Sequence, residues 1–395
     1  MLSIDEAVRA VLERVHPLPA ERVPLEQAAG RVLAEPARAT VDMPPFRSSA
    51  MDGFAVRAAD TPGRLPVVAA IPAGRPAGRP LARGEAMAIA TGGEVPDGAD
   101  GVAPIEVVVE TDNSIELAEA VTAGAHVRER AGDARAGDVV VEAGVRLGPA
   151  QIGALAAAGV AEVACGRRPR AIVLATGTEL RRPGEPLAPG EVYEANGLLL
   201  EAALQGAGAT VERLDAVADD PAAHRDALER GLEADLLVSS GGVSVGPHDL
   251  VRRIVGELGV EEVFWGVAVR PGKPASFGVR GRTLVFGLPG NPVSTLVGFE
   301  LFVRPAVLAL QGSAEPGPVF RPGQLAHPVR RNAARDQLVR ARTQLAGEHV
   351  LLEPLPGQES HMIVRAAGAG ALVLIPRGEG EVGAGAPVRY LEVGV

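Results

Sequence analysis

Four loops between residues 176 and 294 combine glycine with hydroxyl, acidic or basic side chains, the residue types from which anion sites are built. They are residues 176–179 (TGTE), 239–246 (SSGGVSVG) with Asp249 just beyond, 270–274 (RPGKP) and 287–294 (GLPGNPVS). Glycine lets the backbone come close to a ligand, and free N–H groups at the start of a helix favour an anion. The loops therefore predict a phosphate or oxyanion site.

Two loops nearer the N-terminus are rich in acidic and small residues. They are residues 45–55 (PFRSSAMDGFA) and 89–100 (IATGGEVPDGAD). Taken alone, Asp52-Gly53 is a turn signal. Acidic loops that face an anion site favour a divalent cation between carboxylate and phosphate, most naturally Mg²⁺ with its hard oxygen ligands. The residues alone thus predict a phosphate or oxyanion site with Mg²⁺, and they do not name the substrate.

Two other motifs match known fingerprints without the context that those fingerprints need. Gly378-x-Gly380-x-x-Gly383 has dinucleotide-binding spacing, but another strand-like run follows it, so a β-turn is the better interpretation. Residues 242–246 (GVSVG) match the nucleophile elbow of serine hydrolases. The histidines that could complete a triad all fall in a separate C-terminal region, which argues against hydrolysis by Ser244; they are His327, His349 and His361.

The elements that must position these loops alternate between strand and helix over residues 171–311. Expected strands are 172–174, 211–217, 236–238, 263–269 and 284–286, and expected helices are 198–205, 222–230, 250–257 and 292–310. Such alternation predicts a mostly parallel sheet with helices on both faces and ligands at the carboxyl ends of its strands. Short apolar runs between Gly, Pro and Asp predict a β-rich insertion over residues 41–140 and a small β-domain over 316–395.

Composition excludes several classes of protein. The 395 residues carry a net charge of −10 and few aromatic residues, which argues against nucleic-acid binding. A single cysteine, Cys165, excludes an internal disulfide framework and a cysteine-based zinc site. We expect no transmembrane helix, no signal peptide behind the acidic Asp5 and Glu6, and a cytoplasmic protein. Of the 39 cationic residues, 38 are arginine and one is lysine, Lys273.

Six segments in this order resemble the molybdopterin molybdenumtransferase family, the MoeA and gephyrin C-terminal type. They are 45–55 (PFRSSAMDGFA), 91–100 (TGGEVPDGAD), 176–180 (TGTEL), 240–249 (SGGVSVGPHD), 271–274 (PGKP) and 287–294 (GLPGNPVS). The resemblance implies a multidomain α/β plus β protein. Its parts would be an elongated N-terminal segment (1–40 and 141–168), the inserted domain with the SAMDG motif (41–140), a molybdopterin- and nucleotide-binding α/β domain (169–315) and the C-terminal β-domain (316–395).

The family inserts molybdate into adenylylated molybdopterin and releases AMP in molybdenum cofactor biosynthesis. The resemblance therefore implies a transferase that uses Mg²⁺ and acts as a homodimer with a composite site. It also implies molybdate and adenylylated molybdopterin as substrates. Contacts with the molybdopterin adenylyltransferase and with acceptor molybdoenzymes are further expectations, and nucleic-acid and membrane partners are not expected.

Site residues carry over only where this sequence matches the family motifs. The expected molybdate ligands are Arg270, Lys273, Ser294, Arg340 and Ser360. The expected catalytic residues are Asp52, Thr91, Glu179, Asp219 and Asp249, the last two also as Mg²⁺ ligands. The expected substrate-binding residues are Asn196, Gly241, Gly242, Ser244, Pro289, Gly290 and Asn291.

The sequence departs from the family pattern at several of these motifs. Thr178 replaces the usual Asp of TGDEL, Arg270 replaces a lysine, and Glu359 replaces a glycine before the expected Ser360. Residues 194–196 (EAN) replace the usual Asp-Ser-Asn. Two other functions stay open at this point: a molybdopterin adenylyltransferase, since a related α/β domain performs the preceding step, and a non-enzymatic scaffold of the gephyrin kind.

Overall fold

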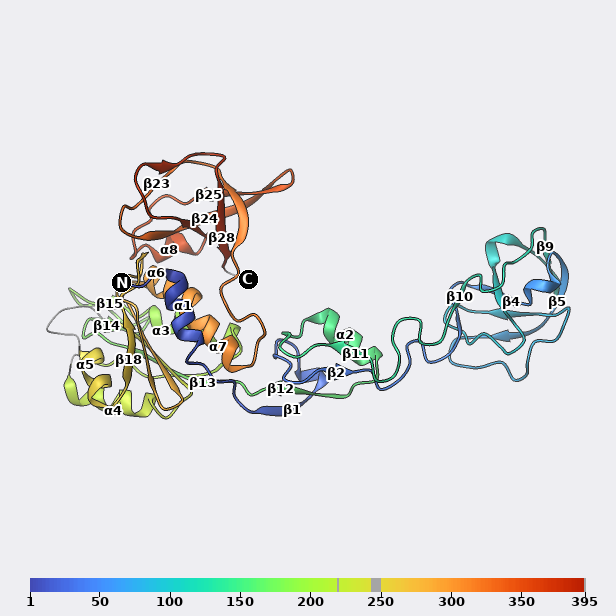
Figure 1. Cartoon of the computed structure of the whole chain (residues 1–395), viewed down its shortest axis with the longest axis horizontal. Helices are drawn as coiled ribbons and strands as arrows, with labels where there is room; N and C mark the ends of the chain where they lie inside the picture. Colours follow the sequence, from blue (N-terminus) through green and yellow to red (C-terminus); the bar gives the residue numbers. More distant parts are fainter. Residues whose placement is uncertain (219, 243–249, 394–395) are drawn as a thin grey trace.

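The computed structural model describes residues 1–218, 220–242 and 250–393. The molecule is elongated (Figure 1). The α/β domain and the C-terminal β-domain lie together at one end, the β-rich insertion lies at the other, and a narrow segment joins them. The multidomain α/β plus β class predicted from the sequence is confirmed.

The narrow segment is built from two antiparallel strand pairs and one helix. These elements are β1 (Ala20–Pro24) with β12 (Glu162–Gly166), β2 (Ala37–Arg38) with β11 (Val139–Val141), the 3₁₀ turn η1 (Leu25–Gln27) and α2 (Pro149–Ala157). Their small core includes Leu33, Leu155 and Cys165. The segment therefore has apolar packing of its own.

The first helix, α1 (Ile4–Leu12), lies outside this segment. A capping box, readable from Ser3 and Glu6 in the sequence, starts this helix: the Ser3 hydroxyl accepts from Glu6 N at 3.2 Å, and Ser3 N donates to Glu6 Oε2 at 2.7 Å. Ile4, Ala7 and Val11 are buried in the core of the α/β domain. By packing, α1 thus belongs with the α/β domain, although the chain then leaves it to form the segment.

The insertion holds a six-stranded sheet in the order β7-β4-β6-β5-β9-β8. Its elements are β4 (Gly53–Val56), β5 (Gly63–Ile71), β6 (Ala86–Ile89), β7 (Gly101–Pro104), β8 (Val108–Thr111) and β9 (Ser114–Leu117), with β3 (Ser48–Ser49) paired to β10 (Val127–Arg128) and 3₁₀ turns η2 (Ala58–Asp60) and η3 (Ile105–Val107). Gly53 must be glycine, because an added Cβ would lie 2.1 Å from the Ala103 carbonyl oxygen.

The α/β domain is built on a six-stranded sheet in the order β16-β13-β17-β21-β20-β18. Its parallel strands are β13 (Arg170–Ala175), β16 (Thr210–Arg213), β17 (Leu236–Ser240) and β21 (Thr283–Leu288). Its antiparallel strands are β18 (Glu261–Trp265) and β20 (Ser276–Arg280). The prediction of a mostly parallel sheet is confirmed, although β20 had no counterpart among the expected strands.

Helices cover both faces of this sheet, because successive side chains of its strands point to opposite faces and both faces are apolar. On one face, α4 (Pro221–Gly231) and α5 (Leu250–Glu257) pack on Ile172 and Leu174. On the other, α1, α3 (Asn196–Gly206), α6 (Pro292–Gly298) and α7 (Arg304–Leu310) pack on Ala171 and Val173. Neighbouring residues of β13 thus serve opposite cores.

Two expected elements are interrupted in the structure. The single helix expected over 292–310 contains a π-helical turn, η4 (Phe299–Val303), between α6 and α7. Pro305 follows at once and has no N–H to continue the α-helical ladder, which explains the turn. The strand expected over 263–269 ends at Gly266, whose φ of 84° lies in the left-handed region, and resumes as the short β19 (Val269–Arg270).

One helical run has the length and apolarity to span a membrane among the residues searched, which are the described ones. It is Pro292–Leu310, and 78% of it is buried inside the structure. That burial is typical of a core helix, which agrees with its place between the sheet and α1.

The C-terminal domain is a small barrel. Its strands are β22 (Arg321–Leu325), β24 (Asp336–Ala346), β25 (His349–Pro354), β26 (Ala371–Ile375) and β28 (Pro387–Glu392), and the pairing of β24 with β26 closes the circle. The pair β23 (Val329–Arg330) and β27 (Glu381–Val382) and the short helix α8 (Ile363–Ala366) flank it. Strand β19 of the α/β domain pairs in parallel with β24, so the two domains share one sheet.

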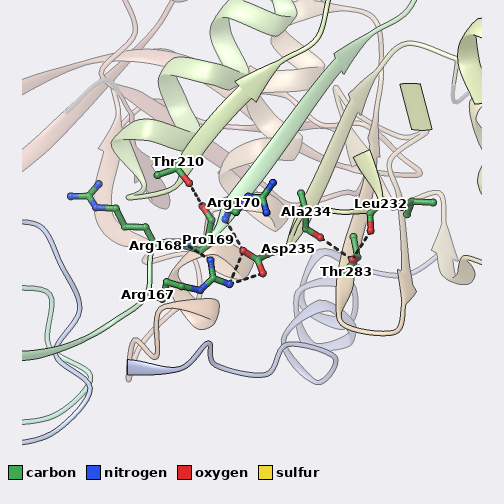
Figure 2. A network of polar contacts seen from close by, with 9 residues as sticks. All are labelled: Arg167, Arg168, Pro169, Arg170, Thr210, Leu232, Ala234, Asp235 and Thr283. Atoms are coloured by element: carbon green, nitrogen blue, oxygen red, sulfur yellow. Dashed lines mark hydrogen bonds and ion pairs between the residues drawn. The ribbon is translucent and has the colours of Figure 1, made fainter. Parts of the chain in front are cut away.

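The amino-terminal edge of the α/β sheet is closed by polar contacts (Figure 2). Asp235 accepts from Arg167 Nη2 at 2.8 and 3.0 Å and from Arg170 N at 2.7 Å. The Thr283 hydroxyl donates to the Ala234 carbonyl at 2.8 Å. These groups are satisfied within the protein, so the opposite, carboxyl edge is the one left for a ligand.

Candidate functional site

Three of the predicted loops meet at the carboxyl edge of the α/β sheet. Thr176 N, after β13, donates to the Ser240 carbonyl at 3.0 Å, and Gly241 N, after β17, donates to the Leu288 carbonyl at 3.0 Å. The short pair β14 (Leu180–Arg181) and β15 (Val192–Tyr193) extends the first of these loops. The loops therefore form one continuous rim along the sheet edge.

Glycines allow this close approach. Gly241 has a φ of 93°, and an added Cβ there would lie 2.7 Å from the Thr176 carbonyl oxygen. Gly242 has a φ of 64°. A Cβ on Gly290 would lie 3.7 Å from the Gly241 Cα, so the second and fourth loops run backbone to backbone. The predicted substrate-binding glycines therefore lie together.

Asn196, at the start of α3, holds two of the loops. Its Nδ2 donates to the Gly290 carbonyl at 2.6 Å and to Ser240 Oγ at 2.8 Å. Its Oδ1 is buried and has no hydrogen-bond partner within the described part of the chain. This atom is an acceptor that a ligand's N–H, a water or a cation would satisfy.

Sequence reasoning assigned no role to three hydroxyl residues that complete this rim, which are Thr176, Ser240 and Thr295. The Thr295 hydroxyl donates to the Pro289 carbonyl at 2.7 Å and lies 3.3 Å from Ser240 Oγ, while Thr176 supports Gly241. All three lie in or directly beside the quoted motifs. Their signal was a hydroxyl next to a glycine-rich turn, which is too common to stand out.

Three predicted residues, Asp219, Ser244 and Asp249, lie outside the described residues. Glu179 is exposed, and its carboxylate lies over Gly177, where an added Cβ would be 2.6 Å from Glu179 Oε2. The described residues contain no group of three Asp, Glu, His or Cys side chains that could hold a metal ion. Mg²⁺ binding therefore stays a prediction.

The PGKP loop lies beside the first turn of α6. Lys273 is exposed, and its carbonyl accepts from Val267 N at 3.0 Å, but its ammonium makes no hydrogen bond or ion pair with any residue that the structure describes. Gly272 has a φ of 112°, and its added Cβ would lie 3.7 Å from the Ser294 carbonyl oxygen. The structure thus brings the Lys273 loop next to Ser294, which is buried with only 4% of its surface exposed.

The C-terminal barrel reaches the same turn of α6. Val293 N donates to the Ser360 carbonyl at 3.0 Å. Asn291 and Pro292 occupy the predicted N-cap and first helical positions, although the Asn291 side chain makes no capping bond. Ser294 and Ser360, predicted from separate motifs, therefore meet across the domain boundary.

Arg340 holds the loop that carries Ser360. The residue is 1% exposed, and its guanidinium donates to the carbonyls of Met362 at 2.6 Å, Gly357 at 2.8 Å and Glu359 at 3.2 Å. Burial lowers the pKa of Arg340 from its ordinary value, and the Glu359 carboxylate opposes that shift. These contacts give Arg340 a structural role in shaping the loop, and its predicted binding of molybdate stays a prediction.

Arg270 faces a different space from Lys273. With Gln358 and Val339 of the barrel domain, it lines a cavity of about 760 Å³ between β19, β23 and the turn at residues 378–380. Lys273 and Ser294 do not line this cavity. The five expected molybdate residues therefore lie in the same region of the structure, but no single described pocket is lined by all five.

The insertion contains a second group of predicted residues. Asp52 Oδ1 accepts from Thr91 N at 2.7 Å and from Thr91 Oγ1 at 3.1 Å. Ser49 N donates to the Gly93 carbonyl, and Gly92 N donates to the Ser49 carbonyl, both at 2.9 Å. The SAMDG and TGGEV motifs are thus side by side, with Asp52 on the wall of a cavity of about 580 Å³.

Within one chain, the structure does not bring Asp52 and Thr91 to the other predicted residues. The insertion and the α/β domain lie at opposite ends of the elongated molecule (Figure 1). The chemistry-bearing residues thus form two separate groups, one on the insertion and one where the α/β domain meets the barrel.

Comparisons with known proteins match consecutive parts of the chain to three family descriptions. These are the MoeA N-terminal region (domain I and II) over residues 2–159, the probable molybdopterin binding domain over 172–309 and the MoeA C-terminal region (domain IV) over 322–393. All the described groups above fall inside these matches.

Full-length relatives agree. The chain is 37% identical to molybdopterin molybdenumtransferase 2 of Mycobacterium tuberculosis over 100% of both chains. It is 36% identical to the molybdopterin molybdenumtransferase of Haemophilus influenzae over 80% of this chain and 79% of that one. Two solved structures of the molybdopterin biosynthesis moeA protein from Pyrococcus horikoshii superpose with TM-scores of 0.80 and 0.85, at 32% and 26% identity. They cover 99% of this chain and 99% and 100% of theirs.

The contacts of Arg340 predict a measurable effect on α6. In Arg340→Lys, a single ammonium replaces the fork that serves three carbonyls, so the 357–362 loop should loosen at a cost of about 1–3 kcal/mol. We expect faster hydrogen exchange at the Val293 amide, which donates to Ser360. Arg342→Lys, on the exposed part of the same strand, is the control. Equal exchange in both variants would contradict the role of Arg340.

Proposed function

The chain belongs to the MoeA family and is a molybdopterin molybdenumtransferase of molybdenum cofactor biosynthesis, and we propose that it inserts molybdate into adenylylated molybdopterin, releasing AMP, at the carboxyl edge of its α/β sheet. One observation carries the choice of place: the glycine-rich rim, the Lys273 loop and the Ser360 loop converge around the start of α6. Amide N–H groups and an unpaired ammonium suit phosphates and a tetrahedral dianion.

Molybdate binding is assigned to Lys273, with Ser294 and Ser360 beside it and Arg270 and Arg340 nearby. Lys273 contributes a compact, exposed positive charge that no described residue neutralises. Arg340 contributes indirectly, because its bonds to the loop carbonyls fix the position of Ser360. The substrate's phosphates are assigned to the rim formed by Gly241, Gly242 and Gly290, where the absence of side chains lets two loops lie backbone to backbone.

Mg²⁺ is the proposed cofactor, with Asp219 and Asp249 as its carboxylate ligands. Support comes from the buried Asn196 Oδ1, a hard oxygen at the same edge that lacks a partner within the described part of the chain. When bound, Mg²⁺ would neutralise charge on the substrate's phosphates. Glu179, which lies over Gly177 on the same rim, is assigned to orienting the substrate rather than to the metal.

A homodimer with composite sites is proposed because Asp52 and Thr91 lie at the far end of their own chain from Lys273 (Figure 1). In the dimer, the insertion of one chain would complete the edge site of the other. The adenylyltransferase that makes the substrate and the apo-enzymes that accept the cofactor are the proposed further partners. The cytoplasm is the proposed compartment, in keeping with a single buried, unpaired cysteine.

The function is tested directly with adenylylated molybdopterin. Purified protein with Mg²⁺ and molybdate should release AMP and yield cofactor that activates an apo-molybdoenzyme. AMP release that does not depend on molybdate would contradict the proposal. Consumption of ATP with free molybdopterin would instead indicate an adenylyltransferase.

Lys273→Arg conserves charge and tests whether the shape of the cation matters. A guanidinium presents a planar fork where the ammonium is a compact point charge, so it would hold a small tetrahedral oxyanion in a different position. We expect molybdate-dependent turnover to fall at least about tenfold, or roughly 1.4 kcal/mol in transition-state stabilisation. Arg280→Lys, a charge-conserving change at an exposed position on the same domain, is the control. Wild-type turnover in Lys273→Arg would show that any cation suffices.

The composite site is tested with two inactive chains carrying different affinity tags. In a purified heterodimer of Asp52→Ala and Lys273→Ala, a composite arrangement places both defects in one site and leaves the other intact. We expect about half of the wild-type turnover from that heterodimer. If each site were formed within one chain, every site would carry one defect and the heterodimer would be as inactive as either parent.

A further inference from the structure

Apart from Arg270, the charged residues that line the cavity of about 760 Å³ between the α/β domain and the C-terminal barrel have no role in the proposed function. Strand β19 forms one side, and the pair β23–β27 with the turn at 378–380 forms the other. The two sides are linked: Arg270 pairs with Gln337 in the β19–β24 register, and Gln337 Nε2 donates to the Arg330 carbonyl at 2.8 Å. The cavity is therefore a built feature of the domain joint.

Cations dominate the charged residues of this wall. Arg270, Arg330 and Arg331 line the cavity, whereas Glu379 is its one acidic lining residue. None of these arginines belongs to an ion pair among the residues that the structure describes, although arginines elsewhere pair with carboxylates. In a chain of net charge −10, three unpaired guanidinium groups around one cavity create a local positive potential.

Arg331 is set in place by the glycine motif that resembles a dinucleotide fingerprint. Arg331 N donates to the Gly380 carbonyl at 3.0 Å, and Gly378 N donates to the Asn332 carbonyl at 2.9 Å. Gly378 has a φ of 151°, and an added Cβ would lie 3.2 Å from Arg331 Nη1. These glycines lie in a bend between β26 and β27 rather than before a helix, and the bend makes room for the Arg331 side chain.

Arg331 also carries an unsatisfied donor. Its Nε is buried and has no hydrogen-bond partner in the described parts of the protein. Arg331 therefore has hydrogen-bonding capacity that no described residue uses, and a guanidinium fork can serve an oxyanion with paired hydrogen bonds. A dianion would also relieve the mutual repulsion of the three cations.

We propose that this cavity is a second oxyanion site, distinct from the rim at the sheet edge, in which Arg330 and Arg331 bind a tetrahedral dianion. The proposal goes beyond the transferase function and does not require turnover. Two ligands share the chemistry: inorganic molybdate, and the phosphate group of a phosphate monoester, for whose body the cavity has room.

Binding to the full-length protein tests this. Equilibrium dialysis at low ionic strength would measure molybdate and AMP separately, with wild type, Arg331→Gln and Arg330→Gln. Arg335→Gln, on the same loop but outside the cavity lining, is the matched control. Lys273→Ala reports on the edge site. Arg330 is exposed, so its variant keeps the test valid even if Arg331→Gln perturbs the turn.

We expect a dianion site that survives Lys273→Ala, weakens at least tenfold in Arg330→Gln and Arg331→Gln, and is unchanged in Arg335→Gln. Occupancy by molybdate but not AMP would identify an inorganic oxyanion as the ligand, and the reverse would identify a phosphate monoester. Binding of both probes that is lost with Lys273→Ala, or that neither cavity variant weakens, would overturn the proposal. Because no turnover is measured, this result is independent of the transferase assay.

Discussion

The joint between the α/β domain and the C-terminal barrel is the constraint on which both proposed anion-binding regions depend. Two sets of backbone hydrogen bonds make it. Strand β19 extends the barrel through β24, with Asp336 N donating to the Ala268 carbonyl at 3.0 Å, and Val293 N donates to the Ser360 carbonyl. The first lies directly before the PGKP loop and the second lies at the start of α6. The barrel therefore fixes the spacing of loops that belong to its neighbour.

Arg340 is a buried cation at this joint, and hydrogen bonds to carbonyl groups offset the free energy needed to remove its guanidinium from water. Removing a guanidinium from water is expensive unless its donors are satisfied. Arg340 meets that condition in part: its two Nη groups donate to three carbonyls of one loop, whereas its buried Nε has no partner among the described residues. Gln358 bridges the backbone of the same strand and loop. A loop of irregular backbone thereby gains a single conformation. The loop that carries Ser360 is thus held in place by the buried Arg340. The two residues lie far apart in the sequence, so neither reveals this contact by itself.

The sequence predicts those features that local chemistry determines. The capping box at Ser3, the strands and helices around β13 and β17, and the glycine turns all follow from side-chain periodicity and backbone freedom. It does not predict the break at Gly266, the π-turn before Pro305 or the direction of Arg340, because each depends on contacts between distant segments. Motif order along a chain carries no distance, so the residues themselves do not predict the separation of Asp52 from Lys273, and only the family resemblance, with its composite site, implies it.

The narrow segment determines how far apart the two groups of site residues lie, and its attachment to the α/β domain is close. Leu18 N donates to the Leu310 carbonyl at 2.7 Å, and an added Cβ at Gly166 would lie 2.1 Å from the Gln311 carbonyl oxygen. The segment thus packs against the end of α7 backbone to backbone, where no side chain can act as a flexible spacer. Strand pairing of β1 with β12 continues that attachment outward. An insertion carried on such a support is held away from its own sheet edge (Figure 1), and that separation is the reason for proposing that Asp52 and Thr91 serve the edge site of a second chain.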